Sequence, residues 1–253
     1  MFATERRRLI VDLVRTSGAI SIRDLADQVS TSEVTVRRDL QKLADEGVLE
    51  RRHGGAVAVG EQRHEPSYAE KTTVAAAEKR AIARRAAERV RDGEAIVLGA
   101  GTTTMALAQE LRDRQDLTVM TNSVLVAQVF ADCPQIDVVL TGGMLRGSIF
   151  ALVGSVAERS LDGMHADHTF LSGNGLTADK GLSTPNQMVA GIDRALAAAG
   201  REVVVLADHT KVGVNSVVQT VPASRIDHLV TDPAADPDVL AALAGLGIVV
   251  TTT

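Results

Sequence analysis

The chain has 253 residues, of which 45% are hydrophobic, and its formal net charge at pH 7 is −5. This length and composition allow a substantial buried core and two domains, which excludes a chain too polar to fold. The single cysteine, Cys133, excludes an intrachain disulfide, and since neither a signal-peptide core nor an apolar run of membrane-spanning length is present, we expect a cytoplasmic protein without membrane contact.

The first two predicted helices have the spacing of a helix-turn-helix. Apolar residues at helical intervals predict a helix over residues 4–17, which Gly18 can end because glycine accepts the left-handed conformation. Ser21, with Asp24 three residues later, opens a short second helix. Only two or three residues then separate this helix from the next one, and such a tight junction is typical of the motif.

The third helix, within residues 30–43, is predicted to read DNA. Ser30 and Glu33 have the spacing of a capping box, so the helix should begin near Thr31. Its inward stripe comprises Val36, Leu40 and Leu43, whereas Val34, Thr35, Arg38 and Gln41, with Arg37 at the flank, point away. The stripe can pack on the other helices, which leaves the opposite face free to contact DNA.

A basic hairpin follows the third helix. Residues 48–51 and 56–59 are predicted to be short strands around the Gly-rich segment 52–55, which completes a winged helix-turn-helix over residues 1–59. The residues predicted to contact DNA are Ser32, Glu33, Val34, Thr35, Arg37, Arg38, Gln41, Lys42, Arg51, Arg52 and His53. The alternative is that Arg37 and Arg38 form a solvated helix face, and Asp39 is expected to be an internal salt-bridge partner.

The charge distribution suits one nucleic-acid surface. Residues 1–58 contain ten Lys or Arg against nine Asp or Glu, whereas the remainder carries a net charge of −6. The arginines that can gather toward phosphates are Arg6, Arg7, Arg8, Arg37, Arg38, Arg51 and Arg52. The acidic remainder argues against a second nucleic-acid surface.

The segment TVRRDLQKLADEGVLERRHGGAV, with the helix spacing before it, resembles the N-terminal domain of the DeoR family of bacterial transcriptional regulators. The likeness extends in register from the helices to the His-Gly-Gly of the wing. It implies sequence-specific binding to double-stranded operator DNA, typically as a repressor of sugar metabolism.

Residues 60–74 are polar, contain Pro66 and lack a clear period, which suits an interdomain linker before a second domain over residues 75–253. The family resemblance continues weakly through residues 66–71. A helix is predicted over residues 73–91. Its buried side comprises Ile82, Ala86 and Val90.

Beyond residue 91, short apolar runs alternate with helical stretches. The predicted strands are residues 95–98, 118–121, 136–141, 168–172, 203–207, 228–231 and 248–251. Such runs, separated by helices, indicate a largely parallel sheet with both faces covered. The predicted fold class is therefore α/β, with an N-terminal winged helix-turn-helix domain and a C-terminal Rossmann-like domain.

The residues that follow these strands are polar and glycine-rich, and an open α/β sheet binds its ligand at the carboxyl ends of its strands. Residues 99–104 precede a helix predicted over 105–111, so backbone amides, hydroxyls and a helix N-terminus are offered together to a phosphate. This loop is a weak signal alone, because its glycines can serve only a tight turn. Similar segments follow at residues 121–123, 141–143, 172–175 and 208–211.

In order, these segments resemble the C-terminal sensor domain of the DeoR family, whose fold is similar to ribose-5-phosphate isomerase and glucosamine-6-phosphate deaminase. The resemblance implies a small phosphorylated sugar or related metabolite as effector. The residues it assigns to effector binding are Gly101, Thr102, Thr103, Thr104, Asn122, Ser123, Gly142, Gly143, Arg146, Asp208 and Lys211.

The sequence departs from the family pattern at residues 187–194. Val189 and Asp193 stand where the family commonly has a glutamate and a lysine. The helical stripe Met188, Ile192 and Leu196 is expected to keep the fold intact. The departure therefore concerns the effector, which can be an unusual one.

An enzyme is the alternative, because isomerases share the fold that the resemblance implies. A sugar-phosphate isomerase or deaminase needs a general base, for which Asp167, Asp208 and His209 are candidates. None stands in a catalytic motif, and Asp167 beside an apolar strand is more often a capping or buried hydrogen-bonded group. Since the six histidines also lack metal-ligand spacing, we predict no enzyme, no metal and no other cofactor.

The sequence as a whole predicts a DNA-binding transcriptional regulator that represses a carbohydrate operon and is relieved by a phosphorylated sugar. Paired recognition helices on pseudo-palindromic half-sites require at least a dimer. A homodimer or homotetramer is therefore expected.

Overall fold

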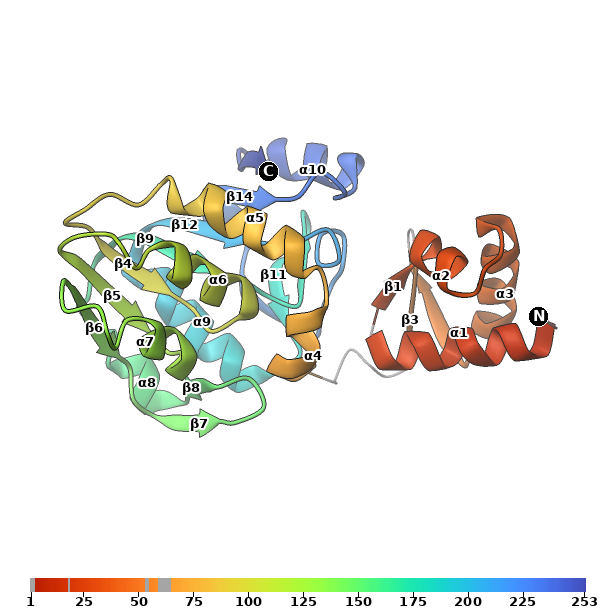
Figure 1. Ribbon diagram of the computed structural model, residues 1–253, viewed down its shortest axis with the longest axis horizontal. Coiled ribbons are helices and arrows are strands. Elements are labelled where there is room, and N and C mark those ends of the chain that lie inside the picture. The colour runs from red at the N-terminus through yellow and green to blue at the C-terminus, as the bar shows by residue number, and fades with distance from the viewer. Residues whose placement is uncertain (1–2, 18, 53–54, 59–64) are drawn as a thin grey trace. The chain divides into compact units, whose positions relative to one another are not determined.

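The computed structural model describes residues 3–17, 19–52, 55–58 and 65–253, and it divides the chain into two compact units, residues 1–66 and 67–253 (Figure 1). The first unit consists of helices and a small antiparallel sheet, and the second is an α/β domain, so the predicted fold class is confirmed. Among the described residues, no helix is both long enough and apolar enough to cross a membrane.

Three helices and three strands make up the described part of the first unit. They are α1 (Ala3–Ser17), β1 (Ala19–Ser21), α2 (Ile22–Gln28), α3 (Glu33–Asp45), β2 (Leu49–Arg52) and β3 (Gly55–Ala58). β3 lies in the middle of the sheet and pairs antiparallel with both β1 and β2. β2 and β3 are the predicted wing, and β1 is an addition to the prediction. Gly18, predicted to end the first helix, lies outside the described residues.

An apolar core holds the three helices of the first unit together. Ile10, Leu25 and Leu40, one from each helix, are fully buried. A buried side chain of this kind stabilises the fold by roughly 1.5–3 kcal/mol relative to exposure. Val36 and Leu43 are buried as well, so the inward stripe predicted for α3 is confirmed.

The third helix begins at Glu33, not near Thr31. Its N-cap is Ser32, whose hydroxyl oxygen accepts a hydrogen bond from the backbone N–H of Thr35 over 3.3 Å. Ser30 instead adopts a left-handed backbone with φ of 49°, and the amide of Thr31 donates back to the carbonyl at the end of α2. The predicted capping box at Ser30 is wrong because that residue is used to close the preceding helix.

A seven-stranded parallel sheet forms the centre of the second unit. Its strands are β4 (Ala95–Leu98), β5 (Leu117–Thr121), β6 (Ile136–Leu140), β9 (Ala166–Leu171), β12 (Gly200–Leu206), β14 (His228–Thr231) and β15 (Val249–Thr252). Their spatial order is β15-β14-β12-β9-β4-β5-β6, and every neighbouring pair is parallel. These are the predicted strands, with small shifts at their ends.

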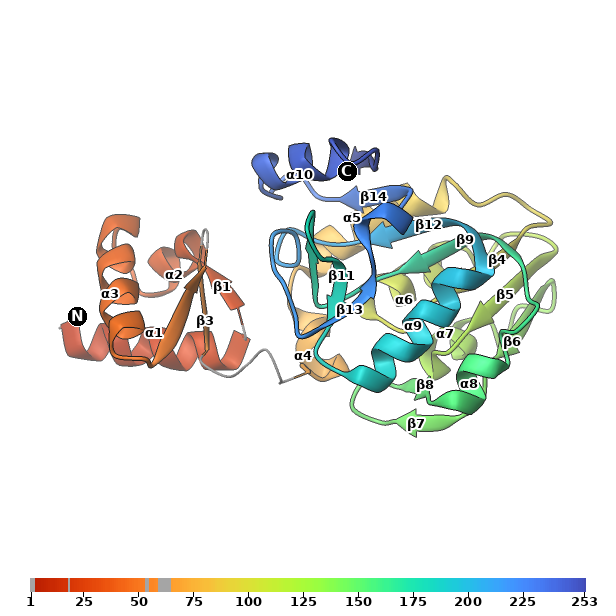
Figure 2. The same cartoon turned by 180° about the vertical axis from the view of Figure 1, so that it is seen from behind.

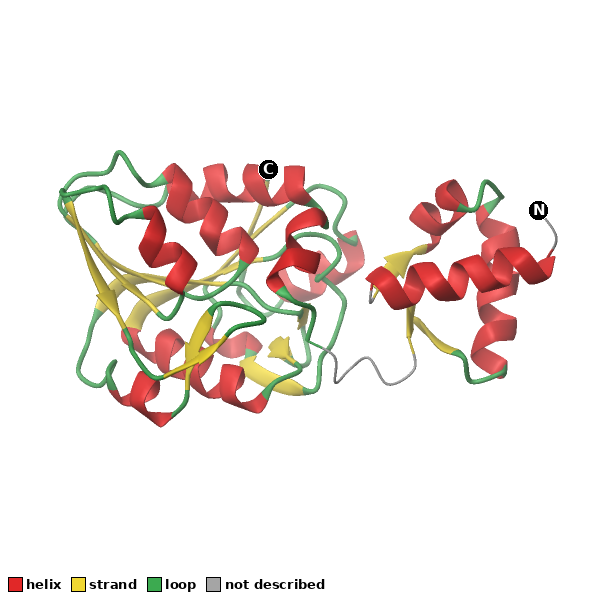
Figure 3. Cartoon of the chain, turned by 60° about the horizontal axis from the view of Figure 1, so that its bottom comes forward, coloured by secondary structure: helices red, strands yellow, loops and turns green. Residues whose placement is uncertain are grey.

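Helices cover both faces of this sheet. The helices are α5 (Ala76–Ala87), α6 (Thr102–Glu110) and α7 (Val124–Val129) on one face, α8 (Ser155–Arg159) and α9 (Gln187–Ala199) on the other, and α10 (Pro237–Ala244) beside β15 (Figures 1 and 2). Figure 3 shows the strands between the two helical layers. Ile96 and Leu98 of β4 join the core under α5 to α7, whereas Val97 joins the core under α9. Both faces of the strand are therefore buried, which explains its continuous apolar run.

Short strands outside the main sheet were not indicated by the sequence. They are the antiparallel hairpin of β7 (Met144–Arg146) and β8 (Ala151–Val153), and the antiparallel sheet of β10 (Gly175–Thr177), β11 (Gly181–Thr184) and β13 (Val218–Val221). Each has only three or four residues, which is too short for a periodic pattern to stand out.

The helix predicted over residues 73–91 is shorter than predicted and corresponds to α5 (Ala76–Ala87). A short helix α4 (Tyr68–Thr73) precedes α5, and Ala75 between them has a left-handed φ of 50° that interrupts helical pairing. α4 occupies the second half of the stretch predicted as linker, because Ser67 and Glu70 form a capping box there. The side predicted to be buried is confirmed at Ile82, Ala86 and Val90.

The stripe predicted for α9 is wrong at one position. Ile192 and Leu196 are fully buried, but Met188 is 39% exposed. Met188 lies in the first turn after the N-cap Asn186, and Val189 packs against the core in its place.

Candidate DNA-binding surface and effector site

The solvent-facing side of α3 carries most of the residues predicted to contact DNA. The exposed ones are Ser32, Glu33, Val34, Arg37, Arg38, Gln41 and Lys42, and Thr35 is half-buried. This surface offers guanidinium, amide and ammonium donors together with the apolar side chain of Val34, which is 58% exposed. Arginine and glutamine can donate to base edges, and an apolar residue can contact the methyl group of thymine.

Two polar side chains of this surface already have partners on the same helix. Arg37 forms an ion pair of 3.0 Å with Glu33, and Gln41 donates a hydrogen bond of 2.8 Å to Asp45. Exposed pairs of this kind contribute little to stability and are easily exchanged for another partner. Arg38 makes no hydrogen bond or ion pair within the described part of the chain. Its guanidinium is therefore available to a base edge or a phosphate.

Asp39, on the inner side of α3, ties that helix to α1. Its carboxylate lies 2.6 Å from Nε of Arg6 and 3.6 Å from Nε of Arg7. The prediction that Asp39 is an internal salt-bridge partner is confirmed. It follows that Arg6 and Arg7, grouped by the sequence with the phosphate-binding arginines, also have a structural role in orienting α3.

The wing is placed by the pairing of β2 with β3. Arg51 pairs with Ala56 and Arg52 with Gly55 in the antiparallel register. A Cβ at Gly55 would collide with the backbone of β1, which is why the middle strand needs glycine here. His53 at the wing tip lies outside the described residues, as do the side chains of Arg51 and Arg52.

The strand order places the predicted effector residues along one edge of the parallel sheet. Chain order runs outward from β4 through β5 to β6, whereas β9 lies on the other side of β4 and is followed by β12. The direction of winding therefore reverses between β4 and β9. In an open α/β sheet the crevice outside such a reversal is the usual ligand site. Residues 99–104, which follow β4 and form the threonine loop, emerge at this position.

The threonine loop ends in the N-terminus of α6, which begins at Thr102 and not at the predicted residue 105. Gly101 is the N-cap, and a side chain at this position would collide with Ser172, which follows β9. Thr103 and Thr104 are buried, and the Thr104 hydroxyl donates to the Gly101 carbonyl over 3.1 Å. Backbone amides at this helix start remain suited to an anion. Ser172 is not among the predicted site residues, although the sequence identifies residues 172–175 as a polar segment that follows a strand.

Asn122 and Ser123 support the threonine loop through the backbone. The Asn122 amide group accepts from the Ala100 N–H over 2.9 Å and donates to the Leu152 carbonyl over 3.2 Å. The hydroxyl of Ser123 accepts from the N–H of Val126 and caps α7. Both side chains are buried, so these contacts position the loops at the carboxyl ends of β4 and β5.

Gly142 and Gly143 turn the chain from β6 into the hairpin that carries Arg146. Their φ angles are 69° and 99°, which side-chain-bearing residues rarely adopt. At Gly143 a Cβ would also lie 2.8 Å from the carbonyl oxygen of Val153. The glycines are therefore required by the turn itself, and Arg146 is half-buried on β7.

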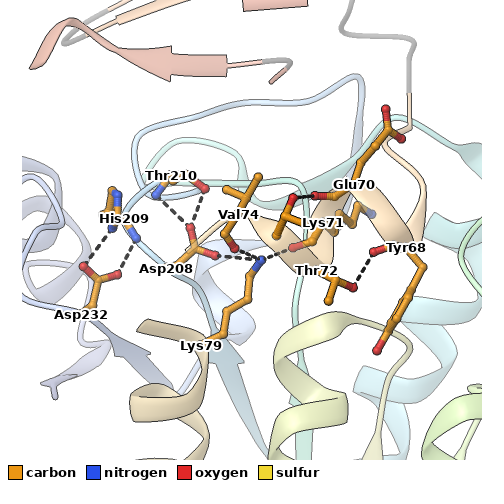
Figure 4. A network of polar contacts seen from close by, with 11 residues as sticks. Tyr68, Glu70, Lys71, Thr72, Val74, Lys79, Asp208, His209, Thr210 and Asp232 are labelled. Carbon is orange, nitrogen blue, oxygen red and sulfur yellow. Dashed lines mark hydrogen bonds and ion pairs between the residues drawn. The ribbon is translucent and has the colours of Figure 1, made fainter. Parts of the chain in front are cut away.

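The loop after β12 contains Asp208, which is labelled in Figure 4, and Lys211. Oδ1 of the buried Asp208 accepts from the N–H of Thr210 over 3.0 Å and from its hydroxyl over 2.5 Å. The Lys211 amide donates to the Asp208 carbonyl over 2.9 Å, so the loop is a tight turn. β12 is separated from β4 by β9 alone, which puts this loop about 10 Å from the threonine loop at ordinary strand spacing. A sugar phosphate can span that distance.

Lys79 of α5 is a buried cation that the sequence prediction missed. Its ammonium donates to the carbonyls of Lys71 and Val74, each over 2.6 Å, and lies 3.9 Å from Oδ2 of Asp208. Burial lowers the pKa of Lys79; Asp208 acts to raise it, and Lys211 acts to lower it further. The signal in the sequence is a lysine three residues before Ile82, in line with the apolar stripe of α5.

The candidates for a general base have structural partners. Asp167 accepts from the Ala95 N–H over 3.2 Å and pairs with Arg201 at 3.3 Å. His209 lies with Nδ1 3.0 Å from a carboxylate oxygen of Asp232. Asp167 is also the second residue of β9, so it lies at the amino-terminal end of the strand, opposite the threonine loop.

A polar hollow of about 480 Å³ lies at the amino-terminal side of the sheet. It is lined by Arg85, Glu88, Arg89, Arg91, Glu94, His168, Arg201, Glu202, Val230 and Thr251. Glu202 pairs with Arg89 at 3.1 Å and with His168 at 3.2 Å. Burial acts to raise the pKa of Glu202, but His168, Arg89 and His228 outweigh burial and lower it. None of the predicted effector residues lines this hollow.

Comparison with known proteins gives matches over both units. Residues 6–62 match the DeoR-like helix-turn-helix domain and residues 74–233 match the DeoR C terminal sensor domain. The chain is 37% identical over 250 residues to the HTH-type transcriptional regulator GlpR of Haloferax volcanii, covering 99% of this chain and 98% of that protein. It is 31% identical to the HTH-type transcriptional repressor GlcR of Bacillus subtilis, over 92% and 89% of the two chains.

Among solved structures, ribose 5-phosphate isomerase A from Methanocaldococcus jannaschii is 20% identical with a TM-score of 0.41, covering 54% of each chain.

Proposed function

We propose that this chain, which belongs to the DeoR family of DNA-binding transcriptional regulators, is a repressor of carbohydrate-metabolism genes whose second unit binds a phosphorylated sugar. The observation that carries the DNA-binding half is the exposed face of α3 within a winged helix-turn-helix. The proposal that the protein represses its genes is supported by the similarity to a relative described as a transcriptional repressor.

The DNA-binding half uses two kinds of contact. Arg38 and Gln41 on the exposed face of α3 contact base edges in the major groove, and the basic residues of β2 contact the phosphates beside it. Asp39 fixes the angle of α3 on α1 through Arg6. Discrimination between operators then depends on α3, whereas affinity for any DNA depends on the wing.

The effector half uses the crevice between β4 and β9. The phosphate group binds at the start of α6, where the amides of the threonine loop and the positive end of the helix dipole act on it. Lys211 contributes a cation from the loop after β12. The sugar hydroxyl groups then face the segments after β9 and β5, which contain Ser172 and Asn122.

The protein acts in the cytoplasm as a homodimer or homotetramer. Support comes from the DNA-binding unit, because a single winged module buries too little surface for tight sequence-specific binding and gains affinity by pairing on two half-sites. The effector changes the spacing or orientation of the paired modules, which releases the operator.

The test begins with the operator, because it also identifies the pathway. Genomic DNA fragments bound by the purified protein are sequenced, and the enriched fragment is used in a gel-shift assay. We expect a pseudo-palindromic site beside genes of carbohydrate metabolism, bound more tightly than shuffled DNA and released by a sugar phosphate. Enrichment of no common sequence would contradict the DNA-binding half.

The comparisons place this chain among regulators and not among enzymes. A turnover assay on the same sugar phosphates is therefore a control. Isomerisation at a useful rate would overturn this part of the proposal.

A further inference from the structure

The first helix of the second unit, α4, is held in place by polar contacts instead of an apolar core. It has six residues and none of them is buried. An isolated helix of this length is unstable in water, so its position depends on what contacts it. α4 begins directly after Ser67, so it is the helix of the second unit that lies nearest in sequence to the first unit.

One contact holds the carboxyl end of α4. The ammonium of Lys79 donates to the carbonyl of Lys71 in the last turn and to the carbonyl of Val74 just after it (Figure 4). The last carbonyls of a helix lack partners within the helix, so a cation there supplies hydrogen bonds and a favourable charge. Lys79 is 5% exposed and is anchored in α5, which makes it a fixed point for α4.

The same ammonium faces the effector loop after β12. Oδ2 of Asp208 lies 3.9 Å from Nζ of Lys79, while Oδ1 of the same carboxylate binds Thr210 (Figure 4). Lys211, the cation assigned to the phosphate, acts to lower the pKa of Lys79, so the two positive charges influence one another. An anion bound at Lys211 would offset that repulsion and strengthen the hold of Lys79 on the carbonyls of α4.

Another contact holds the amino end of α4 to the hairpin that carries Arg146. The N–H of Tyr68 donates to the carbonyl of Ser148 over 2.7 Å, and the Tyr68 ring packs edge to face on Phe150 with 5.7 Å between ring centres. α4 also lies against α6, whose N-terminus forms the proposed phosphate site. The β7–β8 hairpin and α6 are therefore neighbours of α4 that belong to segments assigned to the effector, and Lys79 connects α4 to the loop after β12.

From this juxtaposition we propose that α4 is the element that reports effector occupancy, and that Lys79 is the positioning residue that joins it to the loop of Asp208 and Lys211. The inference deepens the proposed function and rests on it. Binding of a phosphorylated ligand changes the loop after β12 and the β7–β8 hairpin together. Both changes meet at α4, which then moves the chain segment before Ser67.

The first experiment needs no ligand. Hydrogen exchange of the full chain is measured by mass spectrometry for wild type and for Lys79→Met, which removes the ammonium but keeps a long apolar side chain. We expect amides of residues 70–75 to exchange at least about tenfold faster in Lys79→Met, with β4 and β5 unchanged. Arg80→Met is the matched control, because Arg80 is the next residue of α5 and is exposed. Equal exchange in α4 for both variants would overturn the inference.

The second experiment measures coupling. The probe is whichever of ribose 5-phosphate, glucose 6-phosphate and fructose 1-phosphate most raises the melting temperature of the wild type. The ratio of operator Kd with and without the probe is compared between variants. We expect the Kd of Lys79→Met for the probe to stay within about threefold of the wild-type value. The ratio of operator Kd with and without the probe should be about tenfold smaller in the variant than in the wild type, which corresponds to 1.4 kcal/mol of coupling free energy. A purely structural role would lower probe binding and operator binding alike. A wild-type ratio in Lys79→Met would overturn the inference.

Phe150→Ala provides a second variant in case Lys79→Met does not fold. Phe150 is 38% exposed and is not part of the buried core, and its truncation removes the ring contact with Tyr68. Faster exchange in α4 and a smaller ratio are expected again, and their absence would count against the inference. If no sugar phosphate in the panel stabilises the wild type, the proposed effector class is overturned. The hydrogen-exchange experiment without ligand tests the contact between Lys79 and α4 independently of that result.

Discussion

Arg37 and Arg38 are neighbours in the sequence but differ in their surroundings. Arg37 is engaged with Glu33 on the helix surface, whereas Arg38 has no partner among the described residues. A guanidinium that is already paired must exchange partners to bind DNA, so Arg38 is the stronger candidate for reading a base.

The first prediction concerns this arginine and the wing. Arg38→Ala should lose about 1–3 kcal/mol of binding on the specific operator and relax the preference at one base position. Arg52→Ala, if Arg52 contacts a phosphate, should weaken binding to all sequences alike and lower the salt slope by about one. Fluorescence anisotropy on the operator and on single-base variants at several salt concentrations measures both effects. Unchanged operator affinity in the folded double variant would refute the assignment of α3.

The second prediction concerns His228, beside the polar hollow. Burial lowers the pKa of His228, as do Arg89 and His168, while Glu202 and Asp227 act in the opposite direction. Because the folded pKa lies below the unfolded value, the unfolded chain takes up its proton first as the pH falls. The stabilising contribution of neutral His228 is therefore complete above about pH 6.5 and declines below it.

Unfolding by urea at a series of pH values tests this linkage. His228→Gln cannot take up the proton, so the stability of wild type relative to the variant should fall between about pH 7.5 and 5.5. A difference that stays constant over this range, or that grows as the pH falls, would contradict the direction assigned to the pKa of His228.

At the scale of elements, the start of α6 and the loop after β12 lie at the same edge of the sheet. The helix N-terminus and Lys211 are expected to act together on a phosphate, so several charge-assisted hydrogen bonds depend on one chemical group. A phosphorylated sugar should therefore bind at least about tenfold more tightly than its unphosphorylated parent, which requires 1.4 kcal/mol.

The third prediction follows from this arrangement. A sugar phosphate at about a hundred times its Kd should stabilise the second unit by about 2.7 kcal/mol, which is a melting shift of roughly 5–10 °C. Thr103→Ala combined with Lys211→Ala should abolish the shift and leave operator binding without ligand intact. Thermal melting with sugar phosphates, free sugars and inorganic phosphate measures this. Stabilisation by a neutral sugar or a nucleotide while every sugar phosphate fails would show that the crevice has a different ligand.

At the scale of the whole molecule, α3 is the helix that we propose reads DNA, and each chain would bring one such helix to the operator. Two such helices reach successive major grooves on one side of the duplex only when their half-sites are about one helical turn apart, or a multiple of it. The proposed homo-oligomer can therefore be tested through DNA geometry.

The fourth prediction is that operator binding depends on half-site spacing. Insertion of about five base pairs between the half-sites should weaken binding by about tenfold or more, and insertion of about ten should restore part of it. Light scattering of the free protein should give a mass of at least two chains. Equal affinity for the whole operator and for a single half-site would refute the paired arrangement.

The sequence by itself determined the three helices and the wing of the first unit, the parallel sheet of the second unit, and the family. The seven strands of the parallel sheet were predicted because each is a run of apolar residues buried on both faces, a property that can be read within a few residues. The inward stripe of α3 and the internal role of Asp39 could be read in the same local way. Helix boundaries could not be read in this way where two neighbouring residues compete for one role. Ser30 and Ser32 are both possible N-caps of α3, and the structure uses Ser32.

Only the tertiary structure decided what meets at the site. The order of parallel strands is not written in their local pattern, so the reversal of winding between β4 and β9 and the approach of Ser172 to Gly101 appeared only with the fold. The same holds for Lys79. In the sequence it is a charged residue of an alanine-rich helix, and its contacts with Asp208 and with the end of α4 are seen only in the structure. The physical reason is the separation of the interacting residues in the sequence. Periodicity and capping depend on residues a few positions apart, whereas these contacts join distant segments and form only when the whole core is assembled.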